Sequence, residues 1–205
     1  ITAETDEMIK RADLVKQCGG DYIMIDILTA GFAGLQTIRN LDLGMVIHAH
    51  RAGHAAVTRN PKHGISMLAI AKIARLIGVD QLHIGTIVGK MEGSKIEVQE
   101  LEDEIEKEFV PKGKTHALEQ RWGKIKPTLA VCSGGLHPGH LPKLVKYMGK
   151  NIVAQFGGGC HGHPDGTEPG ARAIRQALDA TLKGKSLKVY AKGFPELARA
   201  LEKFE

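Results

Sequence analysis

Aromatic residues, paired cysteines and long apolar runs are all scarce in this 205-residue sequence. Aromatics make up 4% of it, and no segment interleaves Lys or Arg with stacking rings, so we expect no nucleic-acid partner. The three cysteines, Cys18, Cys132 and Cys160, contain no CxxC pair, which argues against a disulfide framework or a structural zinc site. No apolar run approaches the ~20 residues that span a membrane, and we expect no signal peptide. These absences indicate a reducing compartment, and we expect the cytoplasm.

The rest of the composition is that of an ordinary soluble globular protein, with 42% hydrophobic and 25% charged residues. The excess of 28 basic over 23 acidic residues gives a net charge of +5, which suits an anionic small molecule. The length allows one core but falls below the ~250 residues typical of an eight-stranded barrel. Because the first residue is Ile1 rather than Met, we expect a segment upstream.

Short apolar strands alternate with amphipathic helices along the chain. Strands are predicted at 22–28, 45–50, 81–84, 128–132 and 152–156. Helices are predicted at 3–17, 33–41, 64–77, 96–109, 139–148 and 168–182, with a last one from about Pro195. This alternation implies parallel strands joined by right-handed crossovers.

Five strand–helix units in series fit either an open doubly wound sheet or a barrel. An open sheet gathers its ligand loops at one switch point, whereas here every strand ends in a polar or glycine loop, which favours a barrel. We therefore expect an α/β fold consisting of the C-terminal five strand–helix units of a TIM (β/α)8 barrel, with three strands missing on the N-terminal side. Residues 1–185 should form this partial catalytic barrel, residues 186–205 a C-terminal helical extension, and residues 110–127 a surface loop.

Three histidines and an arginine follow one another at the end of the second predicted strand, in the sequence HAHRAGH from His48 to His54. The two-residue period of a strand places His48 and His50 on one face, and the guanidinium of Arg51 at the strand end can hold a phosphate. Two imidazoles at this spacing could also share a zinc ion, with a third ligand from the HGH at 161–163. We find no Asp or Glu at the strand ends that would complete such a metal site.

Glycine-rich loops follow the last three predicted strands. In HIGTIVGKMEG, from His83 onwards, glycines bracket the single cation of Lys90, which indicates a lid. Ser133-Gly134-Gly135 follows the fourth strand and Gln155-Phe156-Gly157-Gly158 the fifth, and the backbone N–H groups of such loops can cradle an anion. Two separate anion sites would suit a bisphosphate, or a phosphate and a carboxylate.

Four motifs, HAHRAGH, HIGTIVGKMEG, SGGLHPGH and QFGGGCHGHPDG, resemble in this order the large subunit of ribulose-1,5-bisphosphate carboxylase/oxygenase (Rubisco). The resemblance runs from about Thr5 to about Ala180. The stretch AVTRNPKHGIS and the compact loops are most similar to the archaeal form III.

The resemblance implies a role for each matching residue. His50 matches the histidine that contacts the substrate hydroxyls and helps proton transfer, and Lys90 matches the lid lysine that stabilises the carboxylated transition state. The matching substrate-binding positions are Arg51 and His83 at one phosphate, Ser133, and the other phosphate's cradle with its loop: Gly134, Gly135, Gln155, Phe156, Gly157 and Gly158.

The family's Mg2+ site, a lysine carbamylated by CO2 followed by an Asp and a Glu, has no counterpart in this sequence. The general-base lysine and the N-terminal domain of the family are also missing. We therefore expect the metal ligands upstream and the isolated chain to be inactive. The complete protein would be a homodimer or higher homo-oligomer that acts on ribulose 1,5-bisphosphate with CO2 or O2, and fixation of CO2 would give two molecules of 3-phosphoglycerate.

Three other functions compete with carboxylation. A Rubisco-like protein would act as an enolase or isomerase on a sulfur-containing sugar phosphate, but His50, Arg51, Lys90 and both glycine loops argue for the carboxylase. A catalytically inert barrel fragment or scaffold would account for the missing metal ligands. The two HxH pairs suggest a metal-dependent hydrolase, which would bind a divalent metal through His48 and His50.

Overall fold

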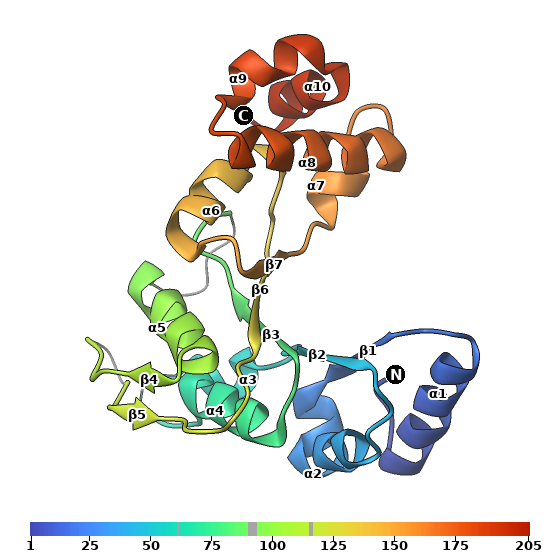
Figure 1. The fold of residues 1–205 in the computed structure, drawn as a ribbon, viewed down its shortest axis with the longest axis vertical. Helices are drawn as coiled ribbons and strands as arrows, with labels where there is room; N and C mark the ends of the chain where they lie inside the picture. The colour runs from blue at the N-terminus through green and yellow to red at the C-terminus, as the bar shows by residue number, and fades with distance from the viewer. Residues whose placement is uncertain (61, 90–93, 115–116) are drawn as a thin grey trace. The chain divides into compact units, whose positions relative to one another are not determined.

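The computed structural model describes residues 1–60, 62–89, 94–114 and 117–205, and the chain divides into two compact units. The first unit is Ile1–Ile84 with Gln99–Val131, and the second is Gly85–Val98 with Cys132–Glu205. The α-helices are α1 (Thr5–Gln17), α2 (Ile27–Asn40), α3 (Ala55–Thr58), α4 (Met67–Ile77), α5 (Lys95–Glu106), α6 (Leu141–Met148), α7 (Gly158–His161), α8 (Thr167–Leu182), α9 (Leu187–Tyr190) and α10 (Pro195–Phe204) (Figure 1). The strands are β1 (Tyr22–Asp26), β2 (Val46–His50), β3 (Gln81–Gly85), β4 (Phe109–Val110), β5 (Gln120–Arg121), β6 (Leu129–Cys132) and β7 (Ile152–Ala154).

A five-stranded sheet with the order β1-β2-β3-β6-β7 confirms the predicted parallel α/β architecture. β1 and β2 run parallel with Asp26 opposite His50, and β2 and β3 run parallel with His48 opposite Gln81. At one end of the pair formed by β3 and β6, the N–H of Leu129 donates to the carbonyl of Asp80. At the other end the N–H of Ser133 donates to the carbonyl of Gly85, so β6 also runs parallel to β3.

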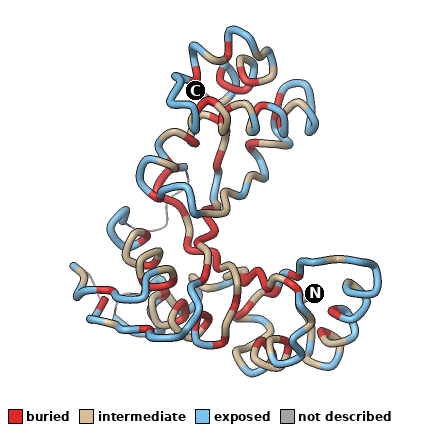
Figure 2. Tube along the Cα trace, viewed as in Figure 1, coloured by how far each residue is buried: buried red, intermediate tan, exposed pale blue. Residues whose placement is uncertain are grey.

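In the first unit, helices α1 and α2 pack against β1, and the buried stretches of the chain concentrate in the strands (Figure 2). α1 begins where the Glu4 carboxylate accepts hydrogen bonds from the N–H groups of Asp6 and Glu7. Its apolar stripe is narrow, with Met8 and Ala12 buried one helical turn apart. α1 therefore contributes only these two residues to the core, and the rest of its surface is largely polar and charged.

The first strand is shorter than predicted, because the chain becomes helical at Ile27 immediately after Asp26. The apolar residues Ile27 and Leu28 had suggested a strand to residue 28, but periodicity does not distinguish a short buried strand from a buried helical turn. Within α2, Gly31 has φ 76° and ψ 157°, a conformation open to glycine that interrupts the helix. The strand therefore ends on Asp26, and this carboxylate lies at the carboxyl edge of the sheet.

The predicted surface loop at 110–127 is partly wrong, since it contains an antiparallel strand pair and a buried aromatic ring. Phe109 pairs with Arg121 and Val110 with Gln120. The indole of Trp122 is buried, donates a hydrogen bond to the Glu104 carboxylate, and lies 4.4 Å below the guanidinium carbon of Arg75. These side-chain contacts come from distant helices, so the polar composition of the segment did not predict them.

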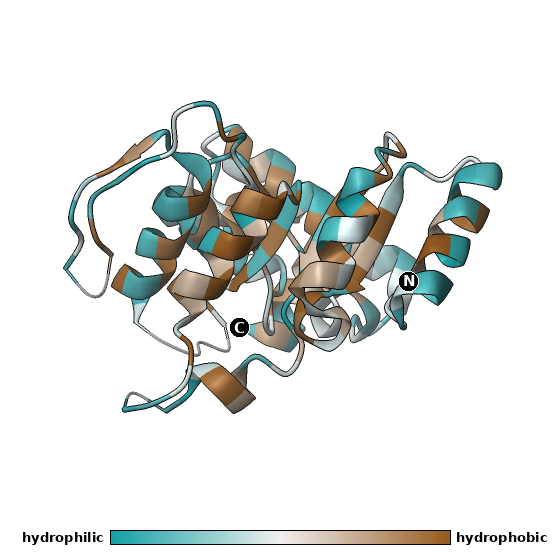
Figure 3. Cartoon of the chain, turned by 90° about the horizontal axis from the view of Figure 1, so that it is seen from below, coloured by the Kyte–Doolittle hydropathy of each residue, from teal (hydrophilic) through white to brown (hydrophobic). Residues whose placement is uncertain are grey.

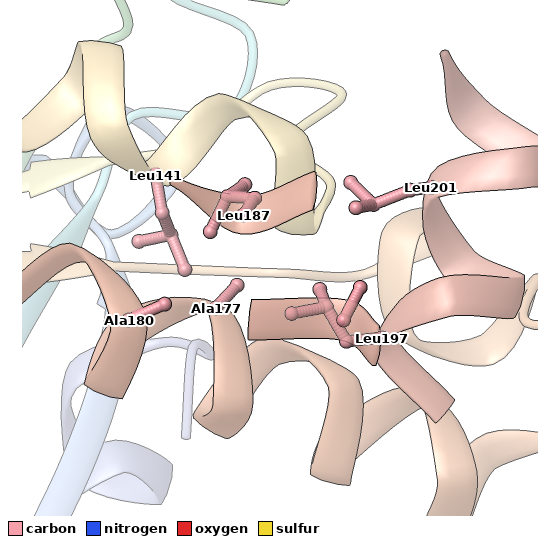
Figure 4. Packing of buried hydrophobic residues seen from close by; sticks show 7 residues of the cluster. Leu141, Ala177, Ala180, Leu187, Leu197 and Leu201 are labelled. Carbon is pink, nitrogen blue, oxygen red and sulfur yellow. The ribbon is translucent and has the colours of Figure 1, made fainter. Parts of the chain in front are cut away.

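In the second unit, α8, α9 and α10 share an apolar cluster (Figure 4). Its buried members are Leu141, Ala177, Ala180, Leu187, Ala191, Leu197 and Leu201. The apolar pattern of residues 168–182 also predicts that Leu182 is buried, but α8 packs on α10 through its small alanines and leaves Leu182 exposed. Residues 186–205 thus pack against α6 and α8 through this cluster, and the boundary after residue 185 stays a prediction.

Polar and apolar segments alternate on the helices, as an amphipathic pattern requires (Figure 3). The helical period of residues 96–109 predicts that Ile96, Leu101, Ile105 and Phe109 face the core; Leu101 and Ile105 are buried, whereas Ile96 and Phe109 are exposed. These two residues lie at the ends of the predicted segment, where the helical period no longer holds them over the core. In the described parts of the chain, no helix is both long and apolar enough to cross a membrane.

Candidate functional site

In the first unit, the ends of β1 and β2 bring Asp26 and His50 together. They are opposite each other in the strand register, and 2.5 Å separates the Asp26 Oδ1 from the His50 Nδ1. Their side chains are 28% and 33% exposed, so both are partly shielded and still accessible. This corrects the sequence-based view that no carboxylate lies at a strand end. β1 ends at Asp26, two residues earlier than predicted, and only this observed end places the Asp26 carboxylate at the edge of the sheet.

His48 is buried in a chain of hydrogen bonds below His50. Its Nδ1 lies 2.6 Å from the hydroxyl of Tyr22 and 2.9 Å from Oε1 of Gln81, and its Nε2 lies 2.6 Å from Nε2 of His83. The Tyr22 hydroxyl donates to Gln81, so the network assigns the proton of His48 to Nδ1 and makes its Nε2 an acceptor for the N–H of His83. Both ring nitrogens of His48 are engaged within the protein.

His83 is 3% exposed, and its burial, together with the nearby His50, His48 and Arg51, lowers its pKa to about 3. Burial also lowers the pKa of His48. The rings of His83 and His50 make a T-shaped contact, with the centroids 4.4 Å apart. The buried imidazoles of His48 and His83 are therefore neutral at pH 7. His50 is the most exposed of the three imidazoles.

The two other polar residues of HAHRAGH lie just beyond β2. Arg51 directly follows the strand and is half-buried, as expected for a guanidinium at the strand end. His54 lies at the start of α3, and its Nδ1 is 2.8 Å from the hydroxyl oxygen of Thr58. His54 thus supports the local turn, whereas Arg51 lies beside the cluster of Asp26, His50 and His83.

In the second unit, the glycine loops after three strands converge. A Cβ atom at Gly159 would lie 2.0 Å from the carbonyl oxygen of Leu136, so the loop after β7 is in contact with the loop after β6. A Cβ atom at Gly89, which has φ +78°, would lie 2.7 Å from the carbonyl oxygen of Gly134. Neither close approach could be predicted from composition, since the two glycines that directly precede Gly159 make no such contact.

The predicted anion-cradle residues of this unit are accessible at the loop surfaces. Gly134, Gly135, Gly157 and Gly158 are exposed, and a Cβ atom at either of the last two would meet open space. Ser133 is half-buried at the start of its loop and Gln155 is exposed. Phe156 is partly buried and packs against the apolar cluster of α8–α10, which favours an anchoring role for its ring.

Of the remaining candidate residues, one lies outside the part of the chain that the structure describes, and the HGH motif contributes hydrogen bonds within the fold. Lys90 lies outside the described residues. In the HGH motif, the Nε2 of His163 donates to the carbonyl of Glu196 at 2.9 Å, while its Nδ1 accepts from the N–H of Asp165. Within the described part of the chain, no three His, Cys, Asp or Glu side chains are grouped so as to hold a metal ion. The two HxH motifs therefore offer no support for a metal-dependent hydrolase.

Parallel strands that carry imidazole, carboxylate and guanidinium groups at their carboxyl ends, with glycine loops beside helix starts, define the catalytic domain of a β/α-barrel enzyme. The chain belongs to the ribulose bisphosphate carboxylase large chain family, whose catalytic domain it matches over residues 1–204. The expected family and the partial barrel are thus confirmed.

Curated archaeal relatives agree with this assignment. The ribulose bisphosphate carboxylase of Methanosarcina barkeri is 53% identical over all of this chain, and that of Pyrococcus furiosus is 52% identical. The chain spans about half of these relatives, 49% and 46% of their lengths.

Solved structures of archaeal Rubiscos have the same fold. The dimeric Rubisco of Hyperthermus butylicus superposes with a TM-score of 0.91 at 51% identity, over 99% of this chain and 48% of that one. The octameric enzyme of Pyrococcus horikoshii gives a TM-score of 0.89 at 49% identity, over 99% of this chain and 46% of that one.

Proposed function

We propose that this chain forms part of the catalytic domain of a form III ribulose-bisphosphate carboxylase/oxygenase. The complete protein would add CO2 to ribulose 1,5-bisphosphate, cleave the product to two 3-phosphoglycerates, and accept O2 in a competing reaction. The observation that carries this proposal is the family match over residues 1–204.

His50 would exchange a proton with the substrate hydroxyls in this reaction. It is the most exposed imidazole of its cluster and lies at the carboxyl end of β2, where barrel enzymes bind their substrates. An imidazole is the side chain best suited to general acid–base work near neutral pH. The geometry of His50 with Asp26 supports this role.

Arg51 and His83 would bind one phosphate of the substrate. A guanidinium is always charged and matches phosphate oxygens with two parallel donors. His83 is neutral in the free protein because burial lowers its pKa, but a phosphate dianion beside it would favour its protonated, doubly donating form. Binding of this phosphate should therefore take up protons below neutral pH.

The second phosphate would bind the glycine loops that hold Gly134, Gly135, Gly157 and Gly158. The four glycines are exposed, and the loops that carry them are held together at Gly159. Backbone N–H groups of such loops bind anions, and the absence of Cβ atoms lets a phosphate approach closely. Ser133 and Gln155, at the starts of the two loops, would contact the rest of the substrate, and Lys90 would stabilise the carboxylated transition state.

Magnesium, which the family uses, is not accommodated by the described residues. A hard cation such as Mg2+ prefers several oxygen ligands, and no group of three candidate ligands is found there. We propose that a carbamylated lysine and the other ligands lie on residues outside this chain. The three cysteines are free, which supports a cytoplasmic location, and the dimeric and octameric relatives support a homo-oligomer.

Carbon fixation by the complete protein tests the proposal. The purified protein would be incubated with bicarbonate and Mg2+, supplied with ribulose 1,5-bisphosphate and 14C-bicarbonate, and assayed for acid-stable 14C in 3-phosphoglycerate. Exchange of the proton at C3 with D2O, measured on the same samples, separates enolisation from carboxylation. We expect both activities, each reduced by at least about 100-fold in His50→Ala and retained in His63→Ala, which changes an exposed histidine outside the cluster.

Enolisation without 14C fixation would instead support the enolase or isomerase alternative. Neither reaction with ribulose 1,5-bisphosphate, in protein that is folded and loaded with Mg2+, would refute the proposed function.

A further inference from the structure

We propose that Asp26 is a positioning residue that fixes the orientation and the tautomer of His50. The proposal rests on the proposed function, because it assigns to Asp26 the task of preparing His50 for proton exchange with the substrate. It names a residue that no motif of the sequence singled out.

The strand register makes the contact between Asp26 and His50 a property of the sheet. They form the last pair of residues in the β1–β2 ladder, and residues opposite each other in neighbouring strands direct their side chains to the same face. Asp26 is itself held in place, because its N–H donates to the hydroxyl of Thr2 at 2.8 Å. The carboxylate therefore meets the imidazole from a fixed backbone position.

The Asp26 carboxylate is directed to His50 rather than to the helix that begins beside it. Asp26 occupies the N-cap position of α2, where an aspartate normally accepts a hydrogen bond from an N–H of the first turn. Its side chain makes no such cap bond to α2, a helix whose residues are all described. A residue well suited to capping thus leaves the helix start uncapped and contacts the imidazole.

The 2.5 Å contact assigns the proton of His50 to Nδ1. A carboxylate oxygen and an unprotonated ring nitrogen are both acceptors and would repel at this distance, so the Nδ1–H must donate to Asp26. The N–H of Ala52 also lies 3.2 Å from the same nitrogen, but this longer contact with a neutral donor is the weaker of the two. The tautomer leaves the lone pair on Nε2, the nitrogen that can take up a proton.

Asp26 would also stabilise the imidazolium that forms when Nε2 takes the substrate proton. The proton leaves a substrate hydroxyl, the electrons of the broken O–H bond remain on its oxygen, and the positive charge spreads over a ring that already donates to a carboxylate. The His83 ring, which meets the His50 ring in a T-shaped contact with the centroids 4.4 Å apart, also limits rotation of the imidazole. Both contacts hold the ring in one orientation.

Substitution of Asp26 in the complete protein tests the inference. We expect Asp26→Asn to lower kcat for proton exchange at C3 by roughly 10- to 100-fold, less than the loss of a general base itself. KM should change by less than about threefold, because orientation of a proton acceptor leaves phosphate binding intact. Asp26→Glu should recover part of kcat, and Asp13→Asn, an exposed carboxylate on α1, should behave as wild type.

A double substitution distinguishes positioning from a structural role. In a His50→Ala background, Asp26→Asn should cause no further loss of kcat, because Asp26 acts only through His50. Equal losses in the two backgrounds, or a fall in thermal stability with kcat unchanged, would overturn the inference.

A measurement without turnover keeps the test independent of the proposed function. Diethyl pyrocarbonate acylates an imidazole through its lone pair, and peptide mass spectrometry follows the reaction at His50. We expect Asp26→Asn to slow this acylation at least about fivefold while that of the exposed His63 is unchanged. An unaltered rate at His50 would overturn the inference even if wild-type protein fixed CO2. A slowed rate in protein without activity would reject the proposed function alone.

Discussion

Gly159 lies so close to Leu136 that a Cβ atom at residue 159 would come within 2.0 Å of the Leu136 carbonyl oxygen and 2.7 Å of the Cα of His137. Such distances do not occur between a Cβ atom and backbone, and the neighbouring atoms are not the ends of flexible side chains. The loop after β7 is therefore held against the loop after β6 by the absence of a side chain. The contact supports the neighbouring exposed glycines, Gly134, Gly135, Gly157 and Gly158.

Gly159→Ala should separate these two loops. We expect a loss of about 1–3 kcal/mol, typical of overpacking a tight contact, and weaker binding of ribulose 1,5-bisphosphate. Thermal unfolding and substrate titration of the complete protein measure the two effects. Gly193→Ala is the matched control, since a Cβ atom there meets nothing within 4 Å and its φ is not in the left-handed region. Equal stability of the two variants would contradict the close approach.

The buried guanidinium of Arg75 ties the end of α5 to the segment before β6. It donates to four carbonyl oxygens, those of Glu104, Lys107, Ile125 and Lys126. It also lies over the Trp122 ring, near the buried Glu104 carboxylate. Arg75→Met should cost about 3–5 kcal/mol, because it leaves four carbonyl acceptors without their charged donor, although Lys72 still pairs with the Glu104 carboxylate at 3.2 Å.

Urea unfolding of the Arg75→Met protein measures this loss. Arg75→Lys should recover only part of the stability, because an ammonium cannot reach four dispersed carbonyls. Arg175→Met removes an exposed arginine that pairs with Asp179 on α8, and should cost less than about 1 kcal/mol. A loss at Arg75 no larger than at Arg175 would show that the network adds little.

Stability should fall as the pH drops below about 6.5, because His83 stays neutral in the folded protein. Burial lowers its pKa from the ordinary 6.5 to about 3, so between these values the unfolded chain binds a proton that the folded protein does not. The contribution is complete above pH 6.5 and is lost towards pH 3, at up to about 1.4 kcal/mol per pH unit.

Urea midpoints at pH 7, 6, 5 and 4 reveal this slope. His83→Gln should be less stable than wild type at pH 7, since it disrupts the bond to His48, but its stability should change less with pH. His63→Gln, at an exposed position, should retain the wild-type slope. The same slope in all three proteins would mean that His83 is protonated in the folded state.

Lys90→Ala should abolish carboxylation in the complete protein and leave proton exchange at C3 largely intact. An ammonium that stabilises the carboxylated transition state acts only after the enediol has formed, and its loss removes roughly 3–4 kcal/mol of charge stabilisation. Parallel assays of 14C fixation and deuterium exchange separate the two steps. Lys95→Ala removes the same charge from the first turn of α5 and should leave both activities unchanged. Equal loss of both reactions in Lys90→Ala would indicate that the lysine only organises the site.

Much of the candidate site could be predicted from sequence because it lies at strand ends, which local patterns locate well. His50 and Arg51 follow from the apolar stretch before them, and the loops at Gly134 and Gly157 from their composition. Asp26 could not be found in this way, because the apolar residues after it hid the end of the strand. Its importance depends on a partner 24 residues away that only the strand register brings opposite it.

The sequence by itself determined the parallel α/β class, the order of the elements and the family, because periodicity and motif residues are properties of neighbouring positions. The tertiary structure decided which polar side chains meet, and so whether His50 has a carboxylate and His48 a tyrosine beside it. It also decided that Trp122 is buried in a polar segment and that Gly159, among several adjacent glycines, cannot accept a side chain. Burial, pKa and close approach depend on atoms from segments distant in the chain, and no local pattern records them.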